Sequence, residues 1–310
     1  MSDDKGKQLA ALLAAGERAA FHGRPGGGVD PLREAVETAA SDGREAEAAA
    51  AAWLLGVCLG ASGRYGPALD VLEPLVVSAE TRETRVLSAL AAATVASVHR
   101  QLGRHAVAQG YDEMALTASE DHDEAGFDAR LGLAADAVGL GDAEGAAARL
   151  AEAESLVEGR ADWWRQRVRL GWVRAEVALL EGRADDAAEA AGAAVDLAEH
   201  SGAPRHVAKG LLFLGVAQVE AGRPAQAVAS LRRGALLAES LGTLPLQWPI
   251  RAVLGALVAE SDAAESQRSL AAARGAVEKI AAELPEELRA EWLARPDIEA
   301  LLSSEASPTG

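Results

Sequence analysis

One stretch of the sequence, residues 162–182 (DWWRQRVRLGWVRAEVALLEG), gathers arginine and tryptophan in a chain that is otherwise acidic. Four of its residues follow one another at spacings of four, three and four, so that on a helix they form one stripe: Arg165, Arg169, Trp172 and Glu176. Arginine supplies a planar fork of hydrogen-bond donors and tryptophan a large contact area, and both are enriched at binding hot spots. The stripe is therefore a candidate site for recognising a partner.

Other residues with reactive or metal-binding side chains do not form a recognisable site. Cys58 stands in an apolar run without a neighbouring basic residue to lower the pKa of its thiol, so a buried, inert thiol is expected. His122 lies among acidic residues that lack the alternating spacing and central glycine of a calcium-binding loop, so a solvated turn is expected. No serine occupies a Gly-x-Ser-x-Gly elbow. The sequence predicts no metal, no cofactor and no enzymatic activity.

The elements that carry these residues repeat along the chain. Short Gly-Arg or Gly-Asp turns follow apolar helical runs at intervals of 38 to 41 residues, and one further interval of 40 reaches Ser261-Asp262. The first six turns begin at Gly23, Gly63, Gly103, Gly141, Gly182 and Gly222. A fixed period of this length is typical of a solenoid built from stacked repeats.

The pattern of each repeat indicates two helices. The glycine can adopt the left-handed conformation that ends the first helix, and the second helix carries apolar residues on one face, as at Ala227, Leu231 and Ala235. Aromatic residues make up only 4% of the chain, and its apolar content is mostly alanine, leucine and valine, which favours helices over sheets. One hairpin cannot bury both of its faces, so seven are expected to stack, each touching only its neighbours. The predicted fold class is all-α.

Two further features lie at fixed distances from the turns. A Leu-Gly pair precedes the turn by seven residues in three copies, at Gly56, Gly215 and Gly255. A small residue follows the turn by five residues in five copies, at Ala68, Ala108, Ala146, Ala187 and Ala227. The pattern resembles the tetratricopeptide repeat family, in a long unit of about forty residues, over roughly residues 45–280. This resemblance implies a right-handed α-α superhelix, similar to the helical sensor and interaction regions of bacterial LuxR-type activators and signalling proteins.

The resemblance also implies which side chains line a concave groove. In such arrays the first helix of each hairpin lines the groove, and the positions thirteen, ten and six residues before the turn glycine face into it. Here these positions hold Arg169, Trp172 and Glu176 in one copy, and the same register selects Trp53 and Lys209 in other copies.

Longer-repeat relatives clamp an extended peptide with a ladder of asparagines along this groove. The equivalent places here hold other residues, Phe213 among them, so clamping of a peptide main chain is not expected. The candidate partner-binding residues are Trp172, Arg169, Glu176, Arg165, Trp53, Lys209 and Phe213. The alternative is that Trp163, Trp164 and Trp172 only pack between neighbouring hairpins.

These features predict a non-catalytic interaction module that binds a protein or peptide partner, such as an amphipathic helix, in its concave groove. The alternative is a regulatory sensor that binds a short peptide or a small hydrophobic ligand, and a homodimer is a further possible assembly.

The net charge of −17 argues against nucleic acid as a partner. No apolar run approaches the length of about 20 residues that spans a membrane. A single cysteine and an N-terminus without signal-peptide features favour the cytoplasm.

The boundaries follow from where the period breaks. The repeat array is expected over residues 1–284. A capping helix, interrupted at Pro296, is expected over residues 285–302, where it would hide the open end of the stack. Residues 303–310 are expected to form a disordered tail. The insertion RPGGGVDP, residues 24–31, is expected to form a flexible loop.

Overall fold

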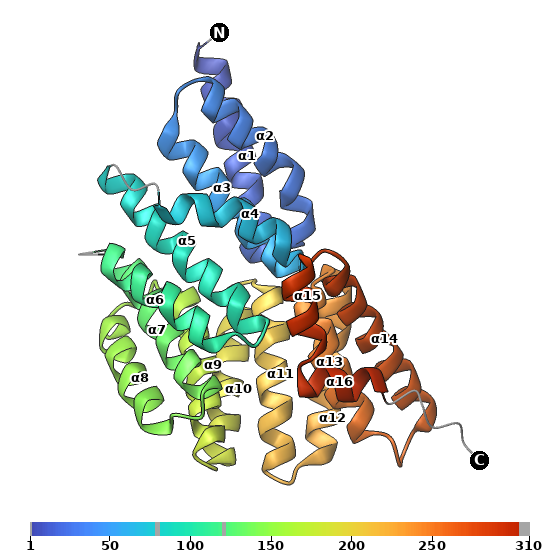
Figure 1. Ribbon diagram of the computed structural model, residues 1–310. Helices are drawn as coiled ribbons and strands as arrows, with labels where there is room; N and C mark the ends of the chain where they lie inside the picture. Colours follow the sequence, from blue (N-terminus) through green and yellow to red (C-terminus); the bar gives the residue numbers. More distant parts are fainter. Residues whose placement is uncertain (1, 78–80, 120–121, 304–310) are drawn as a thin grey trace.

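The computed structural model describes residues 2–77, 81–119 and 122–303. Within these residues the chain forms sixteen α-helices, one short 3₁₀ helix (η1, Pro25–Gly28) and no strand. Figure 1 shows the helices packed side by side in a stack that curves round from the N-terminal to the C-terminal helices. The predicted all-α class is confirmed.

Fourteen of the described helices form seven hairpins, as the period predicts. Their bounds are α1 (Ser2–His22) and α2 (Val29–Ser41), α3 (Glu45–Ser62) and α4 (Tyr65–Val77), α5 (Arg82–Gln101) and α6 (His105–Ser119), α7 (Asp123–Gly139) and α8 (Ala143–Val157), α9 (Trp164–Leu180) and α10 (Ala184–His200), α11 (Pro204–Glu220) and α12 (Pro224–Leu241), and α13 (Leu244–Leu257) and α14 (Ala263–Ala282). Two short helices follow the last hairpin, α15 (Glu286–Leu293) and α16 (Pro296–Ser303).

Each predicted turn joins the two helices of one hairpin. At Gly63 the backbone takes a positive φ of 88°, which closes the end of α3 and which residues with a side chain rarely adopt. Four later turns have the same conformation, at Gly103, Gly141, Gly182 and Gly222. The last hairpin lacks this glycine, and there the Asp262 carboxylate accepts a hydrogen bond from the Glu265 amide at 2.9 Å and caps α14.

The Leu-Gly pairs let the two helices of a hairpin approach closely. A Cβ atom at Gly56 would lie 2.4 Å from the Leu72 side chain, which therefore occupies the space that a larger residue would need. The same arrangement recurs where Gly215 faces Leu231, with 2.6 Å to the hypothetical Cβ, and where Gly255 faces Leu270. The glycine of the pair is thus a packing requirement within each hairpin.

The first hairpin contacts the sixth and the second contacts the seventh, so contacts in the stack are not confined to neighbouring hairpins. The Thr243 hydroxyl donates to the Ala61 carbonyl at 2.7 Å, and Arg205 Nη2 donates to the Ala20 carbonyl at 3.3 Å. These bonds join the ends of α1 and α3 to the start of α11 and to the turn before α13. The prediction that each hairpin touches only its neighbours is therefore wrong, because the curvature of the stack brings distant hairpins together.

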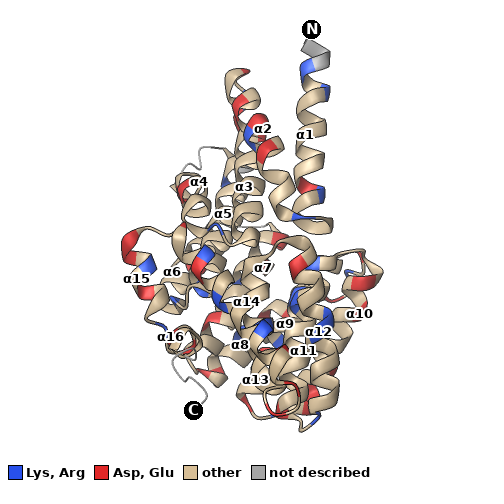
Figure 2. Ribbon diagram, turned by 90° about the vertical axis from the view of Figure 1, so that its right-hand side faces the viewer, with Lys and Arg blue, Asp and Glu red and all other residues tan. Residues whose placement is uncertain are grey.

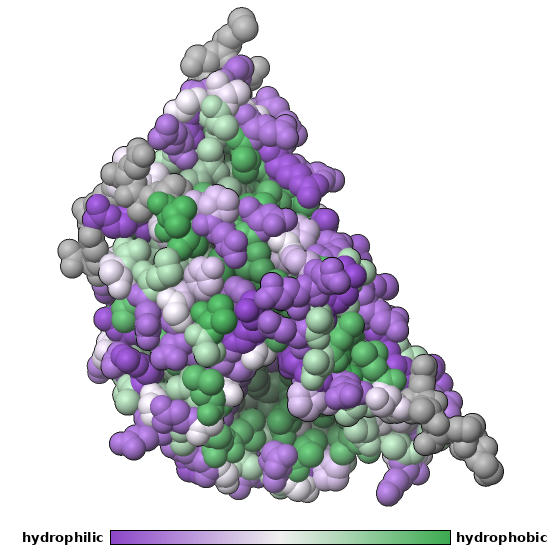
Figure 3. Space-filling view, viewed as in Figure 1, coloured by the Kyte–Doolittle hydropathy of each residue, from purple (hydrophilic) through white to green (hydrophobic). Residues whose placement is uncertain are grey.

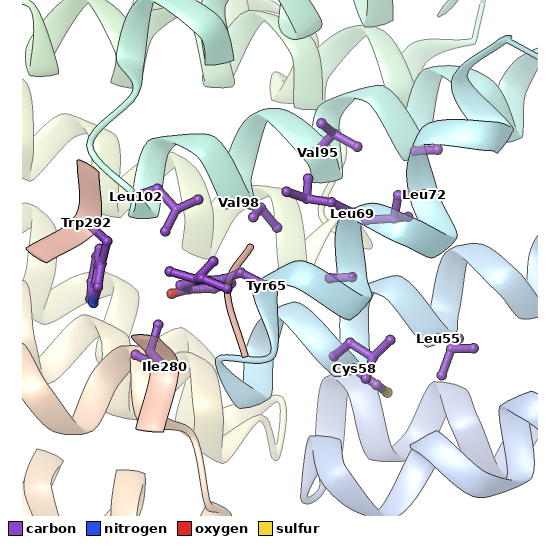
Figure 4. Close-up of a cluster of buried hydrophobic side chains, with 14 of the residues drawn as sticks. Leu55, Cys58, Tyr65, Leu69, Leu72, Val95, Val98, Leu102, Ile280 and Trp292 are labelled. Atoms are coloured by element: carbon purple, nitrogen blue, oxygen red, sulfur yellow. The ribbon is translucent and has the colours of Figure 1, made fainter. Parts of the chain in front are cut away.

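The contacts of the first two hairpins with the last two are called the closure of the stack. Helices α15 and α16 pack beside it. Trp292 of α15 is fully buried and packs edge-on to Tyr65, at the start of α4, with ring centroids 6.5 Å apart. Figure 4 shows Trp292 beside Ile280 of α14 and Leu102, which follows α5, with Tyr65 between them. The break at Pro296 is where the sequence places it, and α16 extends to Ser303. The rest of the expected tail, residues 304–310, lies outside the described residues.

The insertion at residues 24–31 is ordered, so the prediction of a flexible loop is wrong. Its first half forms η1, and α2 begins at Val29. Gly28 is buried, and a Cβ atom there would lie 2.8 Å from Cys58 Sγ and 2.9 Å from Ala19 Cβ. Gly28 thus permits close packing of the insertion between α1 and α3.

The role of the Leu-Gly pair is testable with matched glycine variants. Gly56→Ala places a methyl group against Leu72 and should lower the free energy of unfolding by about 1–3 kcal/mol. In Gly110→Ala, on the exposed side of α6 with no atom within 4 Å of the new Cβ, the better helix propensity of alanine should raise it by up to about 1 kcal/mol. Urea unfolding followed by circular dichroism measures both, and equal effects would contradict this account.

The closure is testable at Trp292. Replacing this buried ring with alanine leaves a cavity between α4, α14 and α15 and should lower the free energy of unfolding by about 3–5 kcal/mol. Leu236→Ala, at a side chain that is 67% exposed on α12, serves as the control and should change it by less than about 0.5 kcal/mol. A Trp292→Ala variant as stable as the control would show that α15 does not hold the closure.

Candidate functional site

The inner sides of the hairpins enclose a cavity of about 510 Å³, here called the first cavity. Helices α3, α5, α7, α9 and α11 supply most of its lining, and the rest comes from the end of α1, the start of α6 and the residues at the start of α13. Six of the seven predicted residues line it: Trp53, Arg165, Arg169, Trp172, Glu176 and Lys209. The register read from the turns therefore selects residues that face the interior, while their role in binding stays a prediction.

A second cavity, of about 770 Å³, adjoins the first and shares Val138, Glu176 and Leu212 with it. Phe213, the seventh predicted residue, lies in its lining together with Trp248 and other mainly apolar residues of α9, α11 and α13. Figure 3 shows this face of the molecule hollowed over α11, with hydrophobic residues on the floor. The two cavities together are called the hollow, charged in its first part and mainly apolar in its second.

Asp128 of α7 pairs with both arginines of the predicted stripe. Arg165 Nη2 lies 3.4 Å from Asp128 Oδ2, and Arg169 Nη1 pairs with Oδ1 of the same carboxylate. The Asp128 side chain is 7% exposed, so both ion pairs are shielded from water. Asp128 is not among the predicted residues, although it lies thirteen residues before Gly141, in the register that selects Arg169. Applying the register to every copy finds it.

Trp172 packs between hairpins and lines the first cavity at the same time. It is 5% exposed, and its ring stacks on His206 of α11 with centroids 5.4 Å apart. Lys209 Nζ lies 4.7 Å from the centroid of the Trp172 ring, within reach of a cation–π interaction. Trp163 packs elsewhere, edge-on to Phe127 at 6.2 Å. Trp172 is thus part of a wall rather than a protruding anchor.

Three other predicted residues of the first cavity interact with neighbouring side chains. Trp53 Nε1 donates to Thr94 Oγ1 at 3.1 Å, which orients the half-buried indole of α3 towards α5. The opposite charges of Glu176 and Lys209 attract each other. Burial raises the pKa of Glu176 and lowers the pKa of Lys209 to about 8, although each charge partly offsets the shift of the other.

A second charged network lies beside the first cavity. Arg100 Nη1 donates to Asp112 Oδ2 at 2.8 Å and to Asp136 Oδ2 at 2.7 Å. Burial, opposed by the Arg100 cation and aided by the neighbouring Asp136 carboxylate, raises the pKa of Asp112 to about 8, because one cation is shared between two acids. Gly132 makes room for the pair, since a Cβ atom there would lie 2.1 Å from Asp112 Oδ2. The only local sequence signal for this network is a glycine inside a helix.

The remaining candidates from the sequence lie apart from the hollow or carry no reactive group. Burial raises the pKa of the Cys58 thiol to about 11, so it stays protonated at neutral pH. His122 Nδ1 accepts a hydrogen bond from the Ala125 amide at 3.3 Å and caps α7. Among the described residues, no group of three or more His, Cys, Asp or Glu side chains is placed to hold a metal ion. The described helices include none that is long and apolar enough to cross a bilayer.

Comparison with known proteins gives matches among solved structures alone, since no family model and no curated protein matches the chain. The Rap conjugation gene regulator of the plasmid pLS20, in complex with the Phr* peptide, has a TM-score of 0.69 at 17% identity and covers 92% of this chain and 79% of its own. A Rap protein complexed with competence and sporulation factor has a TM-score of 0.61 at 14% identity, and the match covers 90% of this chain and 82% of the Rap protein. NprR in complex with its cognate peptide NprX has a TM-score of 0.55 at 14% identity, and the match covers 99% of this chain and 90% of NprR.

At these identities the likeness is one of fold. It supports the tetratricopeptide-like helical repeat over nearly the whole chain, as the spacing of the turns predicts. The finer resemblance to LuxR-type activators stays a prediction.

The protonation of Asp112 gives a testable dependence of stability on pH. Its carboxyl keeps its proton up to a pH of about 8 in the folded chain, but only up to about 4 in the unfolded chain. The stability that this proton confers is therefore complete below pH 4 and is lost as the pH rises to about 8. Asp112→Asn cannot titrate, so the wild type should lose unfolding free energy relative to this variant across that range. Parallel urea-unfolding profiles of the two proteins would show that Asp112 is ionised throughout.

Proposed function

We propose that this chain is a non-catalytic regulatory binding module and that a short peptide occupies its hollow. The observation that carries the proposal is the hollow itself, in which two adjoining cavities of about 510 and 770 Å³ are built from the repeated inner positions of the hairpins. Both volumes lie within the range of about 300–1,000 Å³ that is typical of ligand sites. Charged groups in the first cavity and apolar groups in the second suit a ligand with both kinds of side chain.

The closure of the stack favours a short ligand over a long amphipathic helix. The contacts of Thr243 with Ala61 and of Arg205 with Ala20 join the first hairpins to the sixth and seventh. An inserted helix is about 10–12 Å across with its side chains, and a long one would run into these joined hairpins. Of the two functions considered from the sequence, the closed geometry therefore favours the sensor of a short peptide.

The structural neighbours support the same choice. The pLS20 Rap regulator and NprR are each described as a complex with a peptide, and their repeat folds match this chain along most of its length. A cytoplasmic location and a likeness to LuxR-type activators belong to this proposal as its finer parts. A homodimer is a separate prediction, which light scattering of the purified chain tests.

Peptide binding in the hollow is testable with a blocked variant. Leu212 lines both cavities, and Leu212→Trp should fill the place where they adjoin. Affinity selection from a library of short random peptides, read by mass spectrometry, should retain peptides on the wild type, with retention on Leu212→Trp reduced by tenfold or more.

The control makes the same substitution on the outer surface. Leu236→Trp, at a position 67% exposed on α12, should retain peptides like the wild type. Circular dichroism checks that all three proteins keep their helical content. Equal retention on both variants would place the peptide outside the hollow, and retention of nothing by the wild type would contradict the proposed function.

A further inference from the structure

Four cationic side chains converge on one wall of the first cavity. They are Arg165 and Arg169 of α9 and Arg205 and Lys209 of α11. His206 lies among them: burial lowers its pKa well below the ordinary value, and each of the four cations lowers it further. Figure 2 shows Lys and Arg residues gathered around α9 and α11 in the middle of the molecule, with many acidic residues towards its periphery.

The carboxylates nearest to these cations do not balance them. Arg165 and Arg169 share the single carboxylate of Asp128. Glu176 is the acid that affects the pKa of Lys209, and burial raises the pKa of Glu176 itself. Within the described residues this wall therefore holds more positive than negative charge.

Of these four cations, Arg205 forms no ion pair with a carboxylate of the described residues. Its Nη2 donates to the Ala20 carbonyl, and its Nε has no hydrogen-bond partner. Burial, opposed by Cys58 and aided by Arg169 and Arg165, lowers the pKa of Arg205 to about 10. Arg205 is half-buried, and a cation withdrawn from water without a neighbouring carboxylate destabilises the fold unless another molecule supplies the missing charge.

Two aromatic side chains beside Arg205 also carry unpaired polar atoms. Trp172 Nε1 and His206 Nδ1 have no hydrogen-bond partner among the described residues, and the two side chains are only 5% and 2% exposed. Both residues line the first cavity, as Arg205 does. Buried polar atoms are almost always paired in folded proteins, so a group of unpaired atoms in one cavity wall indicates a place where a ligand completes the set.

We propose that this wall is a carboxylate-binding site, in which Arg205, with Arg165 and Lys209 beside it, receives a carboxylate of the bound peptide while apolar peptide side chains enter the second cavity. The inference rests on the proposed function and adds the chemistry of the ligand. A guanidinium fork matches a carboxylate in geometry. The same wall already shows this pairing once, where Asp128 accepts from Arg165 and Arg169.

Matched peptide pools test the proposal and separate the two sources of a carboxylate. One pool ends in a free C-terminal acid and lacks Asp and Glu, a second ends in an amide and contains Asp and Glu, and a third ends in an amide and lacks both. The full chain should retain peptides of the first or second pool at least tenfold more than those of the third. The pool that is enriched identifies a terminal or a side-chain carboxylate.

Charge variants assign the preference to this wall. Arg205→Gln should abolish it, whereas Arg233→Gln, at an arginine that pairs with Glu199 on the outer surface, should preserve it. Because Arg205 also donates to Ala20, Lys209→Gln serves as a second variant that leaves this bond in place. Both cavity variants should keep the helical content of the wild type.

The outcomes distinguish this inference from the function on which it rests. Equal retention of all three pools, or a preference unchanged in both cavity variants, would overturn the carboxylate site and leave peptide binding intact. Retention of no peptide from any pool would overturn the proposed function as well.

Discussion

The close approach of the two helices in each hairpin is the constraint on which the rest of the structure depends. Gly56 and Gly215 admit a leucine from the partner helix, and the alanines five residues after the turns are fully buried between helices. Because these contacts fix which side of each first helix faces its partner, they also fix which side remains for the interior. The side chains of the hollow thus follow from packing requirements elsewhere on the same helices.

The contacts between distant hairpins reduce the exposure of the inner side chains to water. In an open solenoid, charged groups such as Arg165 and Arg205 would lie in a groove exposed to water. Here the first two hairpins contact the sixth and seventh, and Trp292 of α15 packs against Tyr65 of the second hairpin. The charged side chains are thereby enclosed, where their interactions are stronger and an unpaired charge is more costly than at the surface. The same contacts that stabilise the fold therefore determine the electrostatic environment of the first cavity.

The sequence predicts the parts of the structure that depend on local repetition. The seven turns, the hairpins and the interior register of Arg169, Trp172 and Glu176 were readable because each follows from spacing within one repeat. Arg205 and the contact of Trp292 with Tyr65 were not, because they depend on how far the whole stack curves. The sequence does carry a partial signal for the position of Arg205. Both Arg165 and Arg205 lie seventeen residues before the turn glycine of their own repeat.

The contrast between the acidic chain and its basic interior limits the kind of ligand that fits. The chain carries a net charge of −17, so its outer field opposes the approach of a polyanion. Salt screens exposed charges beyond about 8–10 Å, so the cations of the first cavity attract a ligand only after it has entered the hollow. In the proposed site, a single carboxylate would reach Arg205 without strong repulsion, and the apolar second cavity would supply the remaining affinity. The proposed site would therefore favour a peptide with one buried carboxylate and a mainly apolar remainder over a highly charged one.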